Sequence, residues 1–297
     1  MHKQAALVAA LLLTPALSVP ALPAATQGEA SADARLQALY AADHAWMIAD
    51  RQRIEKADGR SEPGPRLPSV TPEAEARRAA HAREMLARLN AIPAGQLSDG
   101  EKINAAVFRA LLEERIGDAD YRVHEMPFNS DSNFWTYLDA RSPYASVDDY
   151  ENYIARMRDI PRYFAEHVAN ARSGLERGFS VPRVSLVGRE ASIEPFTKAE
   201  GNPFLTVFGQ MPASIPAAEQ TRLRAEAEAA VADSIVPAYG NLLFFMREDY
   251  LPHTRTTLAA TEMPGGDAFY AQQIRKYTTL DLTDRKSTRL NSSHLLI

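Results

Sequence analysis

Apolar residues recur at three- and four-residue spacings along most of this chain, which is the pattern of amphipathic α-helices. Residues 32–54 form the first such segment, whose apolar positions are Leu36, Leu39, Tyr40, Met47 and Ile54. Residues 58–72 then hold two glycines and four prolines, which predicts a loop. A second helix is expected to start at Thr71, an N-cap residue followed by Pro72, and to end at Pro93.

The middle of the chain carries further helix starts. Residues 98–101 match a capping box, and the helix that follows is expected to bury one stripe before Gly117 ends it. That stripe comprises Ile103, Val107, Leu111 and Leu112. Residues 146–149 are expected to cap the next helix, and Pro161 is expected to start another.

The last third of the sequence predicts a loop and two helices. Residues 190–216 are loop-like, because they contain four prolines and two glycines. A long helix is expected over 217–250, with Pro237 kinking or dividing it, since proline lacks an N–H and clashes with the preceding turn. Its second half, 239–250, is apolar on nearly every side and is predicted to be deeply buried. A final helix is expected over 268–277.

Aromatic side chains crowd residues 120–144, namely Tyr121, Phe128, Phe134, Trp135, Tyr137 and Tyr144. Such density fits either the inner wall of a cleft or an extended segment packed onto helices. We favour packing. No segment alternates with period two over more than a few residues, and no fixed-period repeat is visible. The sequence therefore predicts an all-α or mostly α fold, a large irregular helical bundle.

Composition narrows the function classes. The chain has 297 residues, 45% of them hydrophobic, which is a globular composition. It contains no cysteine, so disulfides, thiolate zinc sites, cysteine nucleophiles and a lipid-anchored N-terminal cysteine are excluded. A pI near 5.9 argues against nucleic acid or an anionic membrane as the main partner.

The first 25 residues are typical of a secretory signal peptide. Lys3 precedes an apolar run from Ala5 to Leu13, which is too short to span a bilayer, and small residues follow it. No later segment approaches eighteen consecutive apolar residues. We therefore expect an exported protein, periplasmic or secreted, with no membrane span in the mature chain.

The last 14 residues are interpreted as non-native. Residues 284–294, DRKSTRLNSSH, can be encoded by the sequence of a standard short-read sequencing adapter. On this interpretation the native sequence stops near Thr283 and residues 284–297 have no function. Removing Lys3 and the net +2 of that tail from the formal charge of −5 leaves −8 for residues 26–283.

The sequence contains no complete motif of a known active site. A zinc hydrolase motif needs two histidines one helical turn apart around a glutamate. Between the two predicted non-native ends no two histidines lie within five residues, and each is expected to be structural or at the surface: His44, His81, His124, His167 and His253. The serine-hydrolase elbow and a glycine-rich phosphate loop are also absent from the sequence. We therefore expect no metal site in this fragment.

The order of several weak motifs nevertheless resembles a known family. Residues 233–255 contain Pro-Ala-Tyr and Tyr-x-Pro-x-x-Arg, residues 263–270 contain Pro-x-Gly-x-x-x-Tyr, and residues 274–283 contain Tyr-Thr-Thr. Earlier, Gly174 and Gly178 form a Gly-x-x-x-Gly turn. In this order the motifs resemble the bacterial "domain of unknown function 885" family. The resemblance covers most of 30–283, about the N-terminal half of a typical member.

The resemblance implies a fold and an activity for the parent protein. Family members are exported or lipoprotein-like, largely helical, and similar to gluzincin-type zinc metallopeptidases with a His-Glu-x-x-Pro-Gly-His motif. That motif would lie beyond Thr283, so zinc is expected in the full-length parent and no catalytic residue is assigned here. By resemblance alone, Tyr277, Thr278 and Thr279 are candidates for the wall of the substrate cleft, although we favour a threonine-capped helix end as the explanation of each.

Two functions remain open. In the first, residues 26–283 are the N-terminal helical portion of an exported zinc-dependent peptidase-like hydrolase acting on peptides, inactive without its metal motif and prone to aggregate because buried faces lack their partners. In the second, the chain is a non-catalytic periplasmic helical binding or scaffold protein. Oligomeric state and peptide specificity do not follow from the sequence.

Overall fold

The computed structural model describes residues 30–56, 59–131, 133–280 and 282. The predicted signal peptide, residues 1–25, and the predicted adapter-derived tail, residues 284–297, lie outside these residues. The described part is mostly α-helical with one two-stranded sheet, which confirms the predicted fold class.

The α-helices and strands are α1 Ala32–Asp50, β1 Arg53–Glu55, β2 Ser61–Pro63, α2 Pro72–Asn90, α3 Asp99–Asp120, α4 Val147–Glu176, α5 Ala217–Ala230, α6 Val236–Phe244, α7 Leu251–His253 and α8 Gly266–Thr278. Short 3-10 helices occupy the connections: η1 Ala94–Gln96, η2 Val123–Glu125, η3 Arg183–Leu186, η4 Arg189–Ser192, η5 Glu194–Thr197, η6 Pro203–Gln210 and η9 Ala260–Glu262. Two π-helical segments, η7 Val231–Ile235 and η8 Phe245–Tyr250, lie within the long C-terminal helix.

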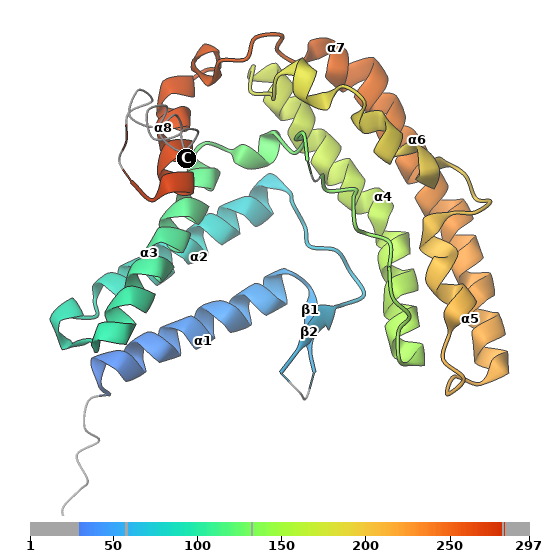
Figure 1. Ribbon diagram of the computed structural model, residues 1–297, viewed down its shortest axis with the longest axis horizontal. Helices are drawn as coiled ribbons and strands as arrows, with labels where there is room; N and C mark the ends of the chain where they lie inside the picture. Colours follow the sequence, from blue (N-terminus) through green and yellow to red (C-terminus); the bar gives the residue numbers. More distant parts are fainter. Residues whose placement is uncertain (1–29, 57–58, 132, 281, 283–297) are drawn as a thin grey trace, which may run out of the picture.

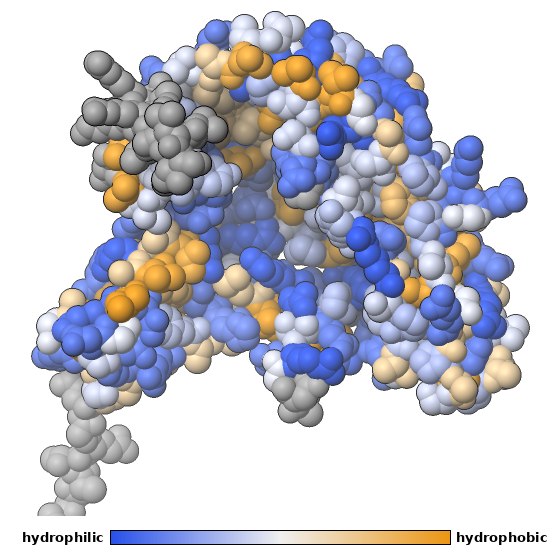
Figure 2. All heavy atoms as spheres, viewed as in Figure 1, coloured by the Kyte–Doolittle hydropathy of each residue, from blue (hydrophilic) through white to orange (hydrophobic). Residues whose placement is uncertain are grey.

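The helices form an arch with two arms (Figure 1). The first arm consists of α1, α2 and α3, and the second consists of α4 and the helical run α5–α7; we call them the N-terminal arm and the C-terminal arm. Helix α8 lies against the end of α3, where Lys276 contacts Glu114 and Asp118. The face between the arms is hollowed and lined mainly by hydrophilic residues (Figure 2).

The main hydrophobic core lies in the C-terminal arm, between α4 and the run α5–α7. Its largest fully buried side chains are aromatic: Phe128, Trp135, Tyr150, Tyr153, Phe204, Tyr239 and Tyr250. Phe128 and Trp135 come from the extended stretch 120–144, so packing of that stretch onto helices is confirmed. A smaller core in the N-terminal arm contains Leu36, Met85 and Leu112.

Two of the three predicted helix caps are confirmed. Thr71 accepts a hydrogen bond from the N–H of Ala74, and Ser146 forms a reciprocal capping box with Asp149. The capping box predicted at Ser98 is wrong. Its N–H donates to Asp33 on α1, and Glu101 accepts from Gln37 instead, so contacts with α1 replace the local ones.

The first helix is shorter than predicted. Helix α1 ends at Asp50, and Ile54 lies in β1, paired with Glu62 of β2. The chain turns at Gln52, whose φ of 54° is left-handed, and the Gln52 carbonyl accepts the N–H of Gly64. A two-stranded hairpin therefore occupies part of the predicted loop 58–72.

Prolines alter the helices less than predicted. Pro161 lies inside α4 and does not start a separate helix, because both halves of α4 pack on the same core through Tyr153 and Phe164. Each of the two later prolines lies two residues after a π-helical segment: Pro237 follows η7, and Pro252 follows η8. The wider π turn relieves the clash and missing N–H of a proline, so the helical run continues to His253.

The stripe predicted to be buried on α3 is largely exposed. Leu112 is fully buried, but Ile103, Val107 and Leu111 are 67%, 56% and 44% exposed. Helices α1 and α2 pack on the neighbouring face of α3, through Phe108 and Leu112. The prediction for the other three residues is therefore wrong for the chain as described.

The long helical run also differs in burial from its prediction. Segment 239–250 buries Tyr239, Met246 and Tyr250, whereas Phe244 is 70% exposed. The run Ala217–His253 is long and apolar enough to cross a membrane by length and composition, but half of its most apolar window is buried within the protein, as in a core helix. Residues 190–216 are a series of 3-10 turns, and α8 begins and ends within two residues of its predicted bounds.

Candidate functional site

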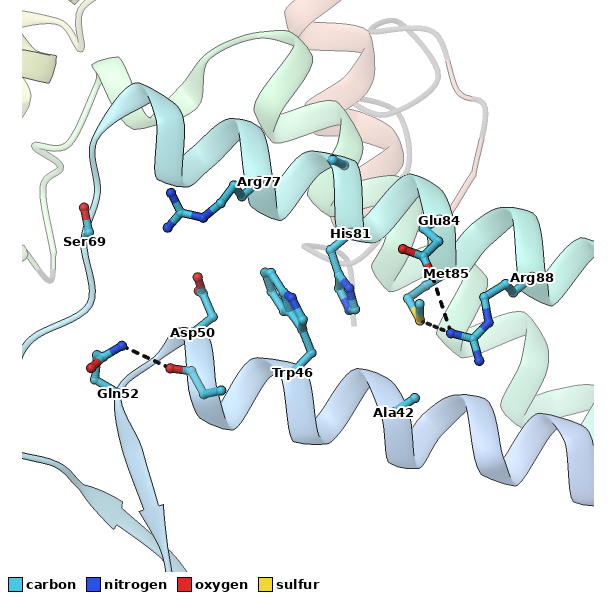
Figure 3. A pocket seen from close by; sticks show the side chains of 12 residues that line it. Ala42, Trp46, Asp50, Gln52, Ser69, Arg77, His81, Glu84, Met85 and Arg88 are labelled. Carbon is cyan, nitrogen blue, oxygen red and sulfur yellow. Dashed lines mark hydrogen bonds and ion pairs between the residues drawn. The ribbon is translucent and has the colours of Figure 1, made fainter.

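Two adjoining hollows lie beside α1 and α2 in the N-terminal arm. The first, which we call the α1–α2 cleft, has a volume of about 760 Å³ and lies between the two helices (Figure 3). The second has a volume of about 430 Å³ and also touches α3 and η2. Trp46, Asp50 and His81 line both hollows, so these side chains separate them.

Trp46 and His81 form a stacked pair at the centre of the cleft. Their ring centroids are 3.9 Å apart and their planes differ by 6° (Figure 3). The Nε2 atom of His81 lies 2.9 Å from Oδ1 of Asp43, which is only 5% exposed. Because a carboxylate accepts, this contact assigns the proton to Nε2 and fixes the orientation of the ring. Trp46 thus rests on an imidazole that cannot turn freely.

The buried charge of Asp43 is matched by an arginine from α3. Nη1 of Arg115 lies 3.2 Å from Oδ1 and 3.1 Å from Oδ2 of Asp43, and Nη2 lies 3.1 Å from the sulfur of Met47. Three helices therefore meet at Asp43: α1 supplies the carboxylate, α2 the imidazole and α3 the guanidinium. A buried carboxylate needs such partners, since desolvation disfavours its charged form.

Arg78 joins the cleft wall to the loop before α2. It donates to Asp50 at 2.6 Å, to Glu75 at 2.6 Å and to the carbonyl of Ser69 at 2.7 Å. Burial opposes its charge, but these two carboxylates outweigh burial and raise the pKa of the Arg78 guanidinium. In the second hollow, burial lowers the pKa of His124, against the opposing charge of Glu75.

The side chains of the cleft are suited to binding a ligand. It offers an indole face, the guanidinium of Arg77, and a weaker pair in which Arg88 lies 3.6 Å from Glu84. Across the described ranges, no group of three or more histidine and acidic side chains is placed to hold a metal ion. The side chains that line the cleft can therefore stack on and charge-pair with a ligand.

The structure places the sequence-predicted candidates elsewhere, at the end of α8. Tyr277 is 80% exposed. Thr278 donates its hydroxyl to the carbonyl of Ile274 at 2.7 Å, and Thr279 adopts a left-handed φ of 59° as the helix ends. None of the three lines the α1–α2 cleft. Their part in a substrate cleft of the parent protein stays a prediction.

Sequence reasoning missed the Asp43, Trp46, His81 and Arg115 cluster, although one signal was present. Asp43 lies four residues after Leu39 and four before Met47, so a charged residue occupies an apolar-stripe position of α1. Such a position requires a buried partner for the carboxylate. The partners are 38 and 72 residues away in sequence, and only the tertiary structure identifies them.

Comparison with solved structures shows the fold. The chain is similar to a crystal structure described as "the putative lipoprotein from Colwellia psychrerythraea", with a TM-score of 0.69 and 17% sequence identity. The match covers 86% of this chain and 48% of that one, so this chain spans about half the length of its structural relative. No curated protein matches the sequence.

A family comparison gives the relationship directly. The family model described as "Bacterial protein of unknown function (DUF885)" matches residues 56–294. The matched range extends into residues 284–294, so the interpretation of that segment as translated adapter stays a prediction. The matched range covers α2 to α8, and it includes the residues that line the α1–α2 cleft from the α2 side. The chain therefore belongs to the DUF885 family of bacterial proteins.

Proposed function

We propose that this chain is the N-terminal helical portion of an exported, zinc-dependent, peptidase-like hydrolase, and that it supplies binding surface rather than the metal site. The observation that carries the proposal is the half-length match: the fold of the Colwellia psychrerythraea protein is shared over 48% of that chain. The other half of a protein of that size has room for a separate metal motif. The description of the relative as a lipoprotein supports export.

Zinc does not fit the described residues, because no three histidine or acidic side chains converge. We therefore derive no catalytic step in this chain. The proposed role of its residues is to bind and orient a peptide, with the α1–α2 cleft as the surface that combines an aromatic face with charged groups.

The test is the complete gene. Its reading frame is expected to continue past Thr283 into a His-Glu-x-x-x-x-His motif, and the purified product is expected to hold about one zinc per chain and to cleave peptides. Replacing the motif glutamate should abolish cleavage while zinc stays bound. A natural stop codon after Thr283, or a full-length product without metal and without hydrolysis, would contradict the proposal.

A non-catalytic periplasmic binding or scaffold protein is the second candidate, and the cleft beside Trp46, which offers an aromatic face and charged groups, favours it. It predicts that the 297-residue chain is monodisperse, unfolds cooperatively and binds its ligand without metal. The first proposal predicts self-association through exposed apolar surface such as Ile103 and Val107 on α3. Sedimentation velocity at several protein concentrations separates the two.

A further inference from the structure

Two adjacent arginines on α2 have different surroundings. Arg78 has three close oxygen partners, from Asp50, Glu75 and Ser69. Arg77 is exposed and lines the cleft, and it makes no ion pair or hydrogen bond with any residue in the described ranges. Its guanidinium lies on the Ser69 side of Trp46, in the space between α1 and α2 (Figure 3). The exposed carboxylate of Glu73 lies one helical turn earlier, and its pKa is lowered by hydrogen bonds to its own backbone N–H and to Thr71 and, to a smaller extent, by the charge of Arg77.

The other charges of the cleft are already matched. Asp50 is paired with Arg78 at 2.6 Å, and Glu84 lies 3.6 Å from Arg88. Arg77 has only the longer-range attraction of the Glu73 carboxylate, and no described residue accepts a hydrogen bond from its guanidinium. A ligand that enters the cleft therefore meets a guanidinium whose donors are available. A guanidinium prefers a planar carboxylate, which it binds through two parallel hydrogen bonds.

The aromatic wall of the cleft is held in place before any ligand binds. His81 covers one face of the Trp46 indole, and Asp43 and Arg115 hold His81. Trp46 remains partly exposed within the cleft. A fixed indole loses little conformational entropy on binding, and its open face is available for stacking of a second ring.

We propose that the α1–α2 cleft binds small compounds in which a carboxylate is attached to an aromatic group, with the carboxylate at Arg77 and the ring against Trp46. The C-terminal end of a peptide that finishes in an aromatic residue has this chemistry. The volume of about 760 Å³ is in the range of small-molecule sites. The proposal concerns binding by this chain alone and does not depend on peptide hydrolysis.

The experiment titrates the 297-residue chain with N-acetyl-L-phenylalanine and with its neutral carboxamide. The chain has two tryptophans, so the Trp135→Phe variant reports on Trp46 by fluorescence. If that variant does not fold, the two indole N–H signals of the unsubstituted chain in an NMR spectrum serve instead. We expect saturable binding of the acid with a Kd on the order of 1 mM, and at least fivefold weaker binding of the carboxamide.

Matched variants assign the contacts. Arg77→Gln is expected to weaken binding of the acid at least fivefold and to abolish the preference for the acid over the carboxamide. Lys102→Gln removes an exposed charge on α3, outside the cleft, and is expected to change nothing. Acetate and inorganic phosphate, which lack a ring, are expected to leave the Trp46 signal unchanged at the same concentrations.

Four results would overturn the proposal: no saturable binding of the acid, equal binding of acid and carboxamide, unchanged binding by Arg77→Gln, or an equally strong Trp46 response to inorganic phosphate. Circular dichroism of the Arg77→Gln variant confirms that any loss is local. An exposed arginine whose one described partner is the exposed carboxylate of Glu73 is expected to be dispensable for folding.

Discussion

The two arms of the arch pair their buried polar groups with different kinds of partner. In the C-terminal arm, buried tyrosines bond to backbone carbonyls within an aromatic core: the hydroxyl of Tyr239 donates to the carbonyl of Trp135 at 2.8 Å, and that of Tyr153 donates to the carbonyl of Phe204 at 3.3 Å. In the N-terminal arm, a carboxylate, an imidazole and a guanidinium meet beside an open cleft.

This difference suggests that the C-terminal arm is a scaffold and that the N-terminal arm holds the binding site. In the C-terminal arm the hydroxyls of Tyr150, Tyr153 and Tyr239 bond to carbonyls of segments distant in sequence, whereas the buried hydroxyl of Tyr250 has no hydrogen-bond partner among the described residues. That arm gains its stability from packed rings. The N-terminal arm has a small core and keeps charged groups next to solvent. Ligand chemistry is therefore expected in the N-terminal arm, and the largest losses of folding free energy in the C-terminal arm.

The largest expected effect is at Trp135. Trp135→Ala removes a fully buried indole that contacts Phe128 and Phe134, and is expected to lower the free energy of unfolding by about 3–5 kcal/mol. Phe244→Ala, at an exposed aromatic position of the same arm, is the control and should change it by less than about 0.5 kcal/mol. Urea titration followed by circular dichroism measures both. Similar costs for the two variants would contradict a packed aromatic core.

Neighbouring leucines on α3 give the matched test for the N-terminal arm. Leu112→Ala is expected to cost about 2–4 kcal/mol, because Leu112 is fully buried among α1, α2 and α3. Leu111→Ala should cost less than about 0.5 kcal/mol, because Leu111 is 44% exposed. The same urea titration applies. A large cost at Leu111 would show that another surface covers the stripe Ile103, Val107 and Leu111 in solution.

Removing the buried charge of the N-terminal arm has an intermediate cost. Asp43→Asn keeps the shape of the side chain but weakens its bonds to His81 and Arg115, and is expected to cost about 1–3 kcal/mol. Asp120→Asn, which loses an exposed pair with Arg83, is the control, with an expected cost below about 1 kcal/mol. Thermal unfolding monitors both variants. Equal midpoints would show that Asp43 does not hold the three helices together.

A pH effect is expected from the C-terminal arm. Burial lowers the pKa of His167 to about 3, against the smaller opposing effect of Glu166, and the ring stacks on Phe134. The unfolded chain binds a proton below its ordinary pKa of 6.5, whereas the folded chain stays neutral there. Stability is therefore full above pH 6.5 and falls toward pH 3, by up to about 1.4 kcal/mol per pH unit.

The variant His167→Leu tests this slope. Between pH 7 and pH 5, the free energy of unfolding of this variant is expected to fall by about 1–2 kcal/mol less than that of the unsubstituted chain. His253→Leu, at an exposed position, should follow the unsubstituted chain. Urea titrations at both pH values measure the difference, and identical slopes for the His167→Leu variant and the unsubstituted chain would show that His167 does not resist protonation.

Periodicity predicted the helices well because their core faces are local features of the sequence. Thr71 and Ser146 were also predictable, since a cap depends on residues within one turn. Burial of the α3 stripe and the box at Ser98 were not, because each depends on how α1 and α2 pack on α3. A local pattern shows that a face is apolar, and tertiary contacts decide which part of it is covered.

The candidate site was harder to predict than the fold. His81 and Asp43 come from different helices, and Arg77 lacks a hydrogen-bond acceptor among the described residues because Arg78 takes the nearby oxygens. The sequence shows Arg77 and Arg78 as two equal neighbours. Only the positions of Asp50 and Ser69 in the fold explain why Arg78 joins two segments of the chain while Arg77 stays available to a ligand.

Amide hydrogen exchange of the 297-residue chain, with and without N-acetyl-L-phenylalanine, tests the division into scaffold and site most directly. With the ligand at several times its Kd, we predict slower exchange in peptides from residues 32–50 and 72–90, the helices of the cleft. Peptides from 147–176 and 217–253 should be slow in both samples and unchanged. Protection confined to those C-terminal peptides would contradict the account.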